Sequence, residues 1–396
     1  MRQTHKHILA ILTIITISCL LSMQALAGDT TGVTKDTIKI GIMGPFTGNA
    51  STYSKAEMGL MAFYKQINDQ GGIHGRKIKV VREDTACSEA KGIAAAKKLI
   101  YQDKVFMLHG NSCSGAALAM KPTIQEAGIP WVIAHAVNYK LTTPLVKNIF
   151  HGIPTSLSSG YSMAKFAMSK PGTTKIAIVA HSNEWAKGYR VPAVELLKKE
   201  YNIEPILDMT LERGSTDATP QVMKIKKSDA QFVLAILYEA ETAIFLREAQ
   251  KFGLDLPILG GYGTDLENTL KRVGDINTVK NYFVLHAFVD NIEGPTMAKW
   301  RDLVKKYYPK VPATAFTYIS LGSGMAVVKA LEASGPDLTR EKFLAELENI
   351  RDLDTGSLAG RITWTPTDHV GVKENATAGF VDGKPTIFKS WGTKVK

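Results

Sequence analysis

The chain has 396 residues, a formal net charge of +11 and 21% charged residues. That length is enough for two lobes of ordinary domain size. The lysines and arginines are dispersed, as in Lys97-Lys98 and Lys305-Lys306, and no stripe of basic and aromatic residues indicates a nucleic-acid partner.

The first 27 residues have the pattern of an export signal. Arg2 and Lys6 form a basic start, residues 8–23 are apolar, and Ala25-Leu26-Ala27 is a small-x-small cleavage site. The apolar run is shorter than the roughly 20 residues of a usual membrane span, which favours cleavage after Ala27 over a membrane anchor. A lipid anchor on Cys19 is an alternative, although no convincing lipobox surrounds it. We expect a soluble periplasmic protein.

Short apolar segments alternate with helical patterns along most of the chain. Strands are predicted at 38–43, 78–83, 106–109, 131–134, 175–180, 232–237, 257–259 and 282–285. Helices are predicted at 58–67, 93–100, 116–127, 191–201, 240–252 and 266–273, then at 316–332 and 338–349, before extended pieces at 360–365 and 376–390. This alternation predicts parallel sheets covered on both faces, and its restart near Lys175 predicts two doubly wound α/β lobes.

Two cysteines remain after the signal is removed, and each follows a predicted strand. If those strands are parallel neighbours, Cys87 and Cys113 lie at the same edge of the sheet, and a disulfide between them is geometrically reasonable. Two thiols without nearby histidines do not make a zinc site. We expect no metal and no cofactor.

Glycine-rich loops at 44–49 and 110–115 follow two of the predicted strands, at the edge where doubly wound sheets bind ligands. The second loop opens a helix whose free N–H groups suit a ligand carboxylate. Ser114 can add a hydroxyl there, and simple helix capping by Ser112 or Ser114 is the alternative. His135 follows another strand and is either an anion donor or a structural histidine. No phosphate-binding, hydrolase or metalloprotease motif is present.

The corresponding strand ends of the second half carry aromatic residues, namely Trp185, Tyr238 and Tyr262. An isolated aromatic side chain is usually core packing. Three of them at one sheet edge favour a wall against an apolar or aromatic ligand, because Trp and Tyr can stack on it and also hydrogen-bond it.

Several of these segments together carry a family resemblance. They are IKIGIMGPFTG from Ile38, the turn at 68–75, the segment 83–87 and Cys113-Ser114. With them the chain resembles the periplasmic leucine/isoleucine/valine-binding proteins of ABC importers, from about residue 38 to 364. The resemblance implies the type I periplasmic binding fold, in which two lobes joined by three crossings close on a ligand. It also implies the Cys87–Cys113 disulfide and an ABC permease as partner of a monomer.

The resemblance also implies lobe boundaries and a set of ligand-binding residues. The N-terminal lobe comprises 28–154 and 286–361, and the C-terminal lobe comprises 155–285 and 362–396. The ligand-binding positions are Tyr53, Ser114, His135, Ala136, Val137, Trp185, Tyr238 and Tyr262. Ser114 holds the ligand carboxylate together with backbone amides.

Two departures from the family pattern bear on the ligand. Val137 replaces a threonine, and Tyr262 replaces the glutamate that pairs with the α-ammonium of an amino acid. A buried ammonium without a carboxylate partner is costly, so we expect an aromatic carboxylate of the benzoate or phenylpropenoid type. A branched-chain amino acid, an amide or urea stays an alternative, because Glu184 or Glu239 could supply the missing charge.

A periplasmic sensor domain is a second class of function, and an exported hydrolase, which no motif supports, is a third.

Overall fold

The computed structural model describes residues 28–288, 290–312 and 314–392, so the expected signal lies outside the described residues. The strands are β1 (Thr37–Gly44), β2 (Lys77–Asp84), β3 (Met107–Gly110), β4 (Trp131–Ile133), β5 (Ile149–His151), β6 (Ile176–Ala180), β7 (Leu207–Thr210), β8 (Phe232–Ile236), β9 (Ile258–Gly260), β10 (Tyr282–His286), β11 (Glu374–Val381) and β12 (Lys384–Gly392). The helices are α2 (Lys55–Asp69), α3 (Glu89–Lys97), α4 (Ser114–Glu126), α5 (Ser156–Met168), α6 (Glu184–Tyr201), α7 (Thr219–Lys226), α8 (Glu239–Lys251), α9 (Leu266–Val273), α10 (Ala298–Tyr307), α11 (Ala315–Tyr318), α12 (Leu321–Ala333) and α13 (Arg340–Glu348).

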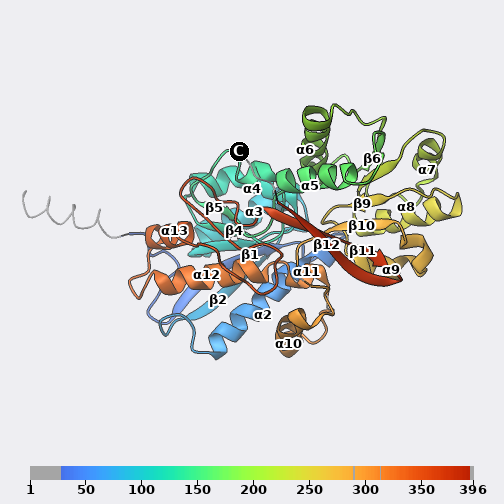
Figure 1. The fold of residues 1–396 in the computed structure, drawn as a ribbon. Helices are drawn as coiled ribbons and strands as arrows, with labels where there is room; N and C mark the ends of the chain where they lie inside the picture. Colours follow the sequence, from blue (N-terminus) through green and yellow to red (C-terminus); the bar gives the residue numbers. More distant parts are fainter. Residues whose placement is uncertain (1–27, 289, 313, 393–396) are drawn as a thin grey trace, which may run out of the picture.

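The first lobe is built on a five-stranded parallel sheet in the order β2-β1-β3-β4-β5. Helices α3 and α4 pack together on one side, while α10, α11 and α12 pack with α2 on the other (Figure 1). Strand β1 lies inside this sandwich, and its Ile38, Ile40 and Ile42 have no exposed surface. Covered faces on both sides explain why this strand is a nearly continuous apolar run.

The second lobe is built on a seven-stranded sheet in the order β12-β11-β10-β9-β8-β6-β7. Strands β6 to β10 pair in parallel, whereas β11 pairs antiparallel with both β10 and β12. The predicted α/β architecture with two lobes is therefore confirmed, with a mixed second sheet (Figure 1). In the part of the chain that the structure describes, no helix is long and apolar enough to cross a membrane.

The predicted strands are all present, but two further strands and three helices were missed: β5, β7, α5, α7 and α10. Strand β7 lies at the sheet edge and alternates between half-buried and exposed residues, so its four residues lack an apolar run. Strand β5 has only three residues, although all of them are buried. Short or edge strands leave a weak pattern in the sequence.

The chain passes between the lobes after β5, after β10 and after α13. The expected lobe boundaries stay a prediction, but the contacts of the last passage favour a later third crossing. The Trp364 indole donates to the His151 carbonyl at 2.8 Å, and Val370 forms a bridge to His151. These residues thus lie beside β5 in the first lobe, and the chain joins the second sheet at β11.

A disulfide joins Cys87 to Cys113, whose Cα atoms are 5.5 Å apart. The two strands that precede these cysteines, β2 and β3, are not direct neighbours, because β1 lies between them. The loops after β2 and β3 instead meet beyond the carboxyl end of β1. The disulfide therefore ties two loops together at the edge of the sheet where a ligand is expected.

Candidate ligand-binding site

Ser114 is the first residue of α4 and follows directly on the loop after β3. No side-chain oxygen caps this helix, so the capping alternative is wrong for both serines. The Ser112 hydroxyl instead has two acceptors within reach of its single proton, Glu57 Oε1 at 2.7 Å and the Tyr53 carbonyl at 3.2 Å. The Ser114 hydroxyl is buried, and no group of the described residues forms a hydrogen bond with it. A free hydroxyl beside free helix N–H groups can hold a carboxylate.

Tyr53 lies in a short 3-10 helix, Ser51–Ser54, directly before α2, and it connects the two lobes. Its hydroxyl donates to the Gly263 carbonyl at 3.2 Å, although Gly263 belongs to the loop after β9. Its ring lies 5.0 Å from the Phe316 ring and 5.5 Å from the Tyr238 ring. The lobes are therefore closed on one another around Tyr53.

Trp185 and Tyr238 form an aromatic wall on the second lobe. They occupy the starts of α6 and α8, which follow β6 and β8, and their rings stack at 4.5 Å with an interplanar angle of 29°. The Tyr238 N–H donates to His181 Nε2 at 2.9 Å, and Nδ1 of that ring bonds to the Leu211 carbonyl at 2.7 Å. His181 is thus a neutral ring that fixes the start of α8, and sequence reasoning missed it because a single histidine has no pattern.

Residues 135–137 follow β4, and all three are buried. His151 donates from Nε2 to the Ala136 carbonyl at 2.8 Å, and the Ser156 N–H donates to the Val137 carbonyl at 2.7 Å, so both carbonyls are already bonded. Burial lowers the pKa of His135 to about 4, which makes the ring neutral at pH 7. Its Nδ1 is buried and has no hydrogen-bond partner within the described ranges. His135 can therefore offer a ligand a hydrogen bond but no charge.

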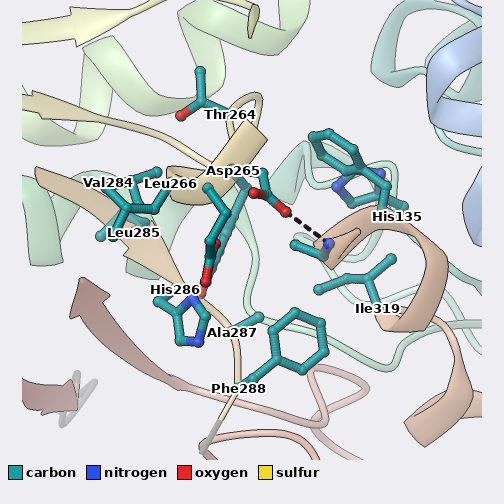
Figure 2. A pocket seen from close by; sticks show the side chains of 14 residues that line it. His135, Thr264, Asp265, Leu266, Val284, Leu285, His286, Ala287, Phe288 and Ile319 are labelled. Atoms are coloured by element: carbon teal, nitrogen blue, oxygen red, sulfur yellow. Dashed lines mark hydrogen bonds between the residues drawn. The ribbon is translucent and has the colours of Figure 1, made fainter. Parts of the chain in front are cut away.

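Tyr262 follows β9 and reaches into the second lobe. Its hydroxyl donates to Asn375 Oδ1 in β11 at 2.7 Å. With His135 and Phe316 it also lines a small cavity of about 20 Å³, seen from close by in Figure 2, which is room for one water molecule. Asp265, which also lines this cavity, accepts a hydrogen bond from the Ala315 N–H at 2.7 Å, drawn as a dashed line in Figure 2.

A larger cleft of about 730 Å³ opens between the lobes next to Tyr53 and Tyr238. Both lobes contribute to its walls, with residues 48–53 and 86–87 from the first and 213–214, 238–241 and 272 from the second. Of the predicted binding residues, Tyr53 and Tyr238 line this cleft, His135 and Tyr262 line the small cavity, and Ser114 and Trp185 line neither. Ala136 and Val137 lie in the hydrophobic cores behind them.

Glu57, on α2, lies beneath this site and was also missed by sequence reasoning. Its side chain fills the space over two strand-end glycines, and a Cβ at Gly44 would lie 2.7 Å from its Cδ. Burial raises the pKa of Glu57 to about 8, although the hydrogen bond from Ser112 acts in the opposite direction. The carboxyl group is therefore protonated at neutral pH, and it supports the loop that carries Ser112 without adding charge to the site.

This raised pKa predicts a pH effect on stability. In the unfolded chain Glu57 ionises near pH 4.5, so between about pH 4.5 and 8 the folded state binds more protons than the unfolded state. The contribution of Glu57 to stability is then present below about pH 4.5 and is lost as the pH rises to about 8. Urea unfolding at several pH values should show that Glu57→Gln stabilises the protein increasingly, relative to the wild type, across this range. The exposed Glu126→Gln is the control, and parallel pH profiles for wild type and Glu57→Gln would contradict the assignment.

Two doubly wound lobes that close on a cleft at their strand ends define the class of type I periplasmic binding proteins. A family model described as "Periplasmic binding protein" matches residues 37–384, and the chain belongs to this family. It is 27% identical over 351 residues to the leucine-, isoleucine-, valine-, threonine- and alanine-binding protein of Pseudomonas aeruginosa, an alignment that covers 86% of this chain and 91% of the relative. The protein is accordingly a solute-binding component of the ABC transporter type and not an enzyme.

Two solved structures share the fold at low sequence identity. A fatty acid ABC transporter substrate-binding protein from Thermomonospora curvata superposes with a TM-score of 0.81 at 20% identity, covering 93% of this chain and 95% of the other. A solute-binding protein from R. palustris in complex with 4-hydroxybenzoate superposes with a TM-score of 0.78 at 21% identity, covering 90% and 97%. These similarities support the fold.

Proposed function

We propose that this protein binds a small aromatic carboxylate in the periplasm, as a monomer, and delivers it to the permease of an ABC importer. The observation that carries the proposal is the unpartnered, buried Ser114 hydroxyl at the start of α4. In this proposal it provides an anion-binding end, and Tyr238, which lines the cleft and stacks on Trp185, provides an aromatic wall. A ligand with a carboxylate and an aromatic body matches both.

The residues that could neutralise an ammonium group already have other partners. Glu184 pairs with Lys187 at 3.0 Å and lies 3.7 Å from Lys140. Glu239 accepts a hydrogen bond from Asn268 and lies 3.5 Å from Arg272. Glu241, which also lines the cleft, accepts a hydrogen bond from the Gly214 N–H at 2.8 Å and lies 3.7 Å from His181 Nε2. An α-ammonium group in the closed cleft would have to compete with these partners for a carboxylate, which is costly. This favours an acid without an amino group.

The ligands named for the similar proteins agree with a carboxylate-binding end. Branched-chain amino acids, fatty acids and 4-hydroxybenzoate share a carboxylate and differ in the rest of the molecule. An anion-binding end combined with a different opposite wall in each protein would account for that range. The named amino acids of the Pseudomonas relative make a branched-chain amino acid the second candidate.

A thermal-shift screen of the purified mature protein tests the proposal. Benzoate, 4-hydroxybenzoate and 4-hydroxycinnamate are compared with fatty acids, benzamide, urea and the branched-chain amino acids. A ligand at 100 times its dissociation constant should add about 2.7 kcal/mol of stability. We expect shifts with the aromatic acids and none with benzamide, which lacks the charge. Shifts with leucine, isoleucine or valine alone would contradict the proposal.

A further inference from the structure

Arg213 lies in the loop after β7, and it lines the large cleft between the lobes. Its guanidinium carbon is 5.4 Å from the centroid of the Tyr238 ring, a distance at which a cation and an aromatic face attract each other. Tyr238 lines the same cleft, and its ring also stacks on Trp185. Arg213 therefore adds a positive charge to the aromatic wall of the second lobe.

The residues on both sides of Arg213 are held by hydrogen bonds to neighbouring elements. The Ser182 hydroxyl donates to the Glu212 side chain at 2.9 Å, and the Gly214 N–H donates to Glu241 Oε1 at 2.8 Å. Ser182 follows β6, and Glu241 lies on α8, so the loop is fixed to the strand-end edge of the second sheet. The Arg213 side chain itself is exposed, and it forms no hydrogen bond or ion pair with the described residues.

The exposed charge in this cleft is positive. Two acidic residues line it, Glu239 and Glu241, but their side chains are only 2% and 5% exposed, and each already accepts a hydrogen bond. A second arginine of the lining, Arg272, lies 3.5 Å from Glu239. The described lining residues of the first lobe include no charged side chain. An anionic group in the cleft would therefore find in Arg213 a cation that has no acidic partner among the described residues.

The cleft has room for more than one end of a ligand. Its volume of about 730 Å³ lies within the range of about 300–1,000 Å³ that is usual for small-molecule pockets. Ser114, the proposed anion-binding end, belongs to the first lobe and lies outside the lining of this cleft, whereas Arg213 belongs to the second lobe and lines it. A single carboxylate held by Ser114 thus leaves the Arg213 guanidinium free for another group.

We infer that Arg213 is a specificity-determining residue that binds a second anionic group of the ligand, in the cleft next to Tyr238. This inference rests on the proposed function and narrows its ligand class to aromatic acids with a second carboxylate or another anionic substituent. A guanidinium and a carboxylate can form two parallel hydrogen bonds as well as an ion pair, which makes recognition of the second group directional.

Matched pairs of ligands test the inference. Terephthalate and 4-carbamoylbenzoate have nearly the same shape, but only terephthalate carries a second charge, and isophthalate and 3-carbamoylbenzoate form a second such pair. Isothermal titration of the wild type should show about tenfold tighter binding of the diacid in at least one pair, which corresponds to about 1.4 kcal/mol. Arg213→Gln should bind the monoamides as the wild type does and should lose the preference. Arg213→Lys, which keeps the charge, should retain a preference for the diacid.

Arg82→Gln is the matched control for loss of an exposed arginine that packs on an aromatic ring. The Arg82 guanidinium carbon is 4.7 Å from the centroid of the Phe46 ring, and Arg82 does not line the cleft. This variant should keep the preference for the diacid. Arg213→Gln should melt close to the wild type without ligand, because surface substitutions usually change stability little.

The outcomes separate the inference from the proposed function. Equal binding of diacid and monoamide by the wild type in both pairs, or a preference that survives Arg213→Gln, would overturn the inference and leave the proposed function standing. Equal weakening of both members of a pair by Arg213→Gln would also overturn it, because Arg213 would then hold the only carboxylate. Binding of no aromatic acid by the wild type would contradict both.

Discussion

Replacement of both disulfide cysteines by alanine should lower the free energy of unfolding by about 3.5 kcal/mol. Cys87 and Cys113 are separated by 26 residues, and the chain-entropy model gives a loss of this size for a loop of that length. Alanine is preferred to serine because Cys113 packs in a buried apolar cluster with Tyr53 and Phe316. Urea unfolding under oxidising conditions measures the difference.

Reduction of the wild type provides the matched comparison for this pair of substitutions. A reducing agent should destabilise the wild type by a similar amount and leave the double variant unchanged, since the variant has no bond to lose. Ligand affinity should also fall, because residues 86 and 87 line the cleft between the lobes. A loss below about 1 kcal/mol would mean that the two loops are held in place without the disulfide.

Removal of the Ser114 hydroxyl should weaken carboxylate binding by about 10- to 150-fold. A hydrogen bond to a charged group typically contributes about 1.5–3 kcal/mol, and the affinity ratio follows from that energy. Ser114→Ala retains the helix N–H groups, so some binding should remain. The hydroxyl has no partner within the described part of the chain, and its loss should not lower the stability of the ligand-free protein.

Ser334→Ala serves as the control for Ser114→Ala. Ser334 is also buried, but its hydroxyl donates to the Ala330 carbonyl at 2.7 Å at the end of α12, far along the chain from the cleft. This control should bind ligand normally and lose some stability. If Ser114→Ala weakened binding by less than about threefold, the ligand carboxylate would have to be held elsewhere.

The strong apolar strands of the fold could be predicted from the sequence, because burial on both faces leaves a continuous apolar run, as in β1 and β8. The edge strand β7 could not, because half of its residues face solvent. The sequence predicted that Cys87 and Cys113 lie at the same edge of the sheet. It did not predict that β1 lies between β2 and β3, because strand order depends on long-range pairing that local patterns do not contain.

The candidate site was predicted only in part, for a related reason. Trp185 and Tyr238 lie within five residues of the ends of the apolar strands β6 and β8, so their place at the sheet edge can be read from the chain. An acidic residue in the first turn of a helix, such as Glu57, is usually exposed to solvent. Its burial here depends on the space left by the glycines at the ends of β1 and β3. The direction in which a side chain points, and the hydrogen bonds that its neighbours already make, are set by the tertiary structure. They could therefore not be predicted from the sequence.

The most direct test of the central claim is calorimetric titration of the ligand-stripped mature protein with 4-hydroxybenzoate and with L-leucine. The proposed site has a carboxylate-binding end and an aromatic wall, and the carboxylates around it, Glu184, Glu239 and Glu241, already have other partners. It therefore predicts saturable one-to-one binding of 4-hydroxybenzoate and no measurable heat with leucine. Tighter one-to-one binding of leucine than of any aromatic acid would contradict it.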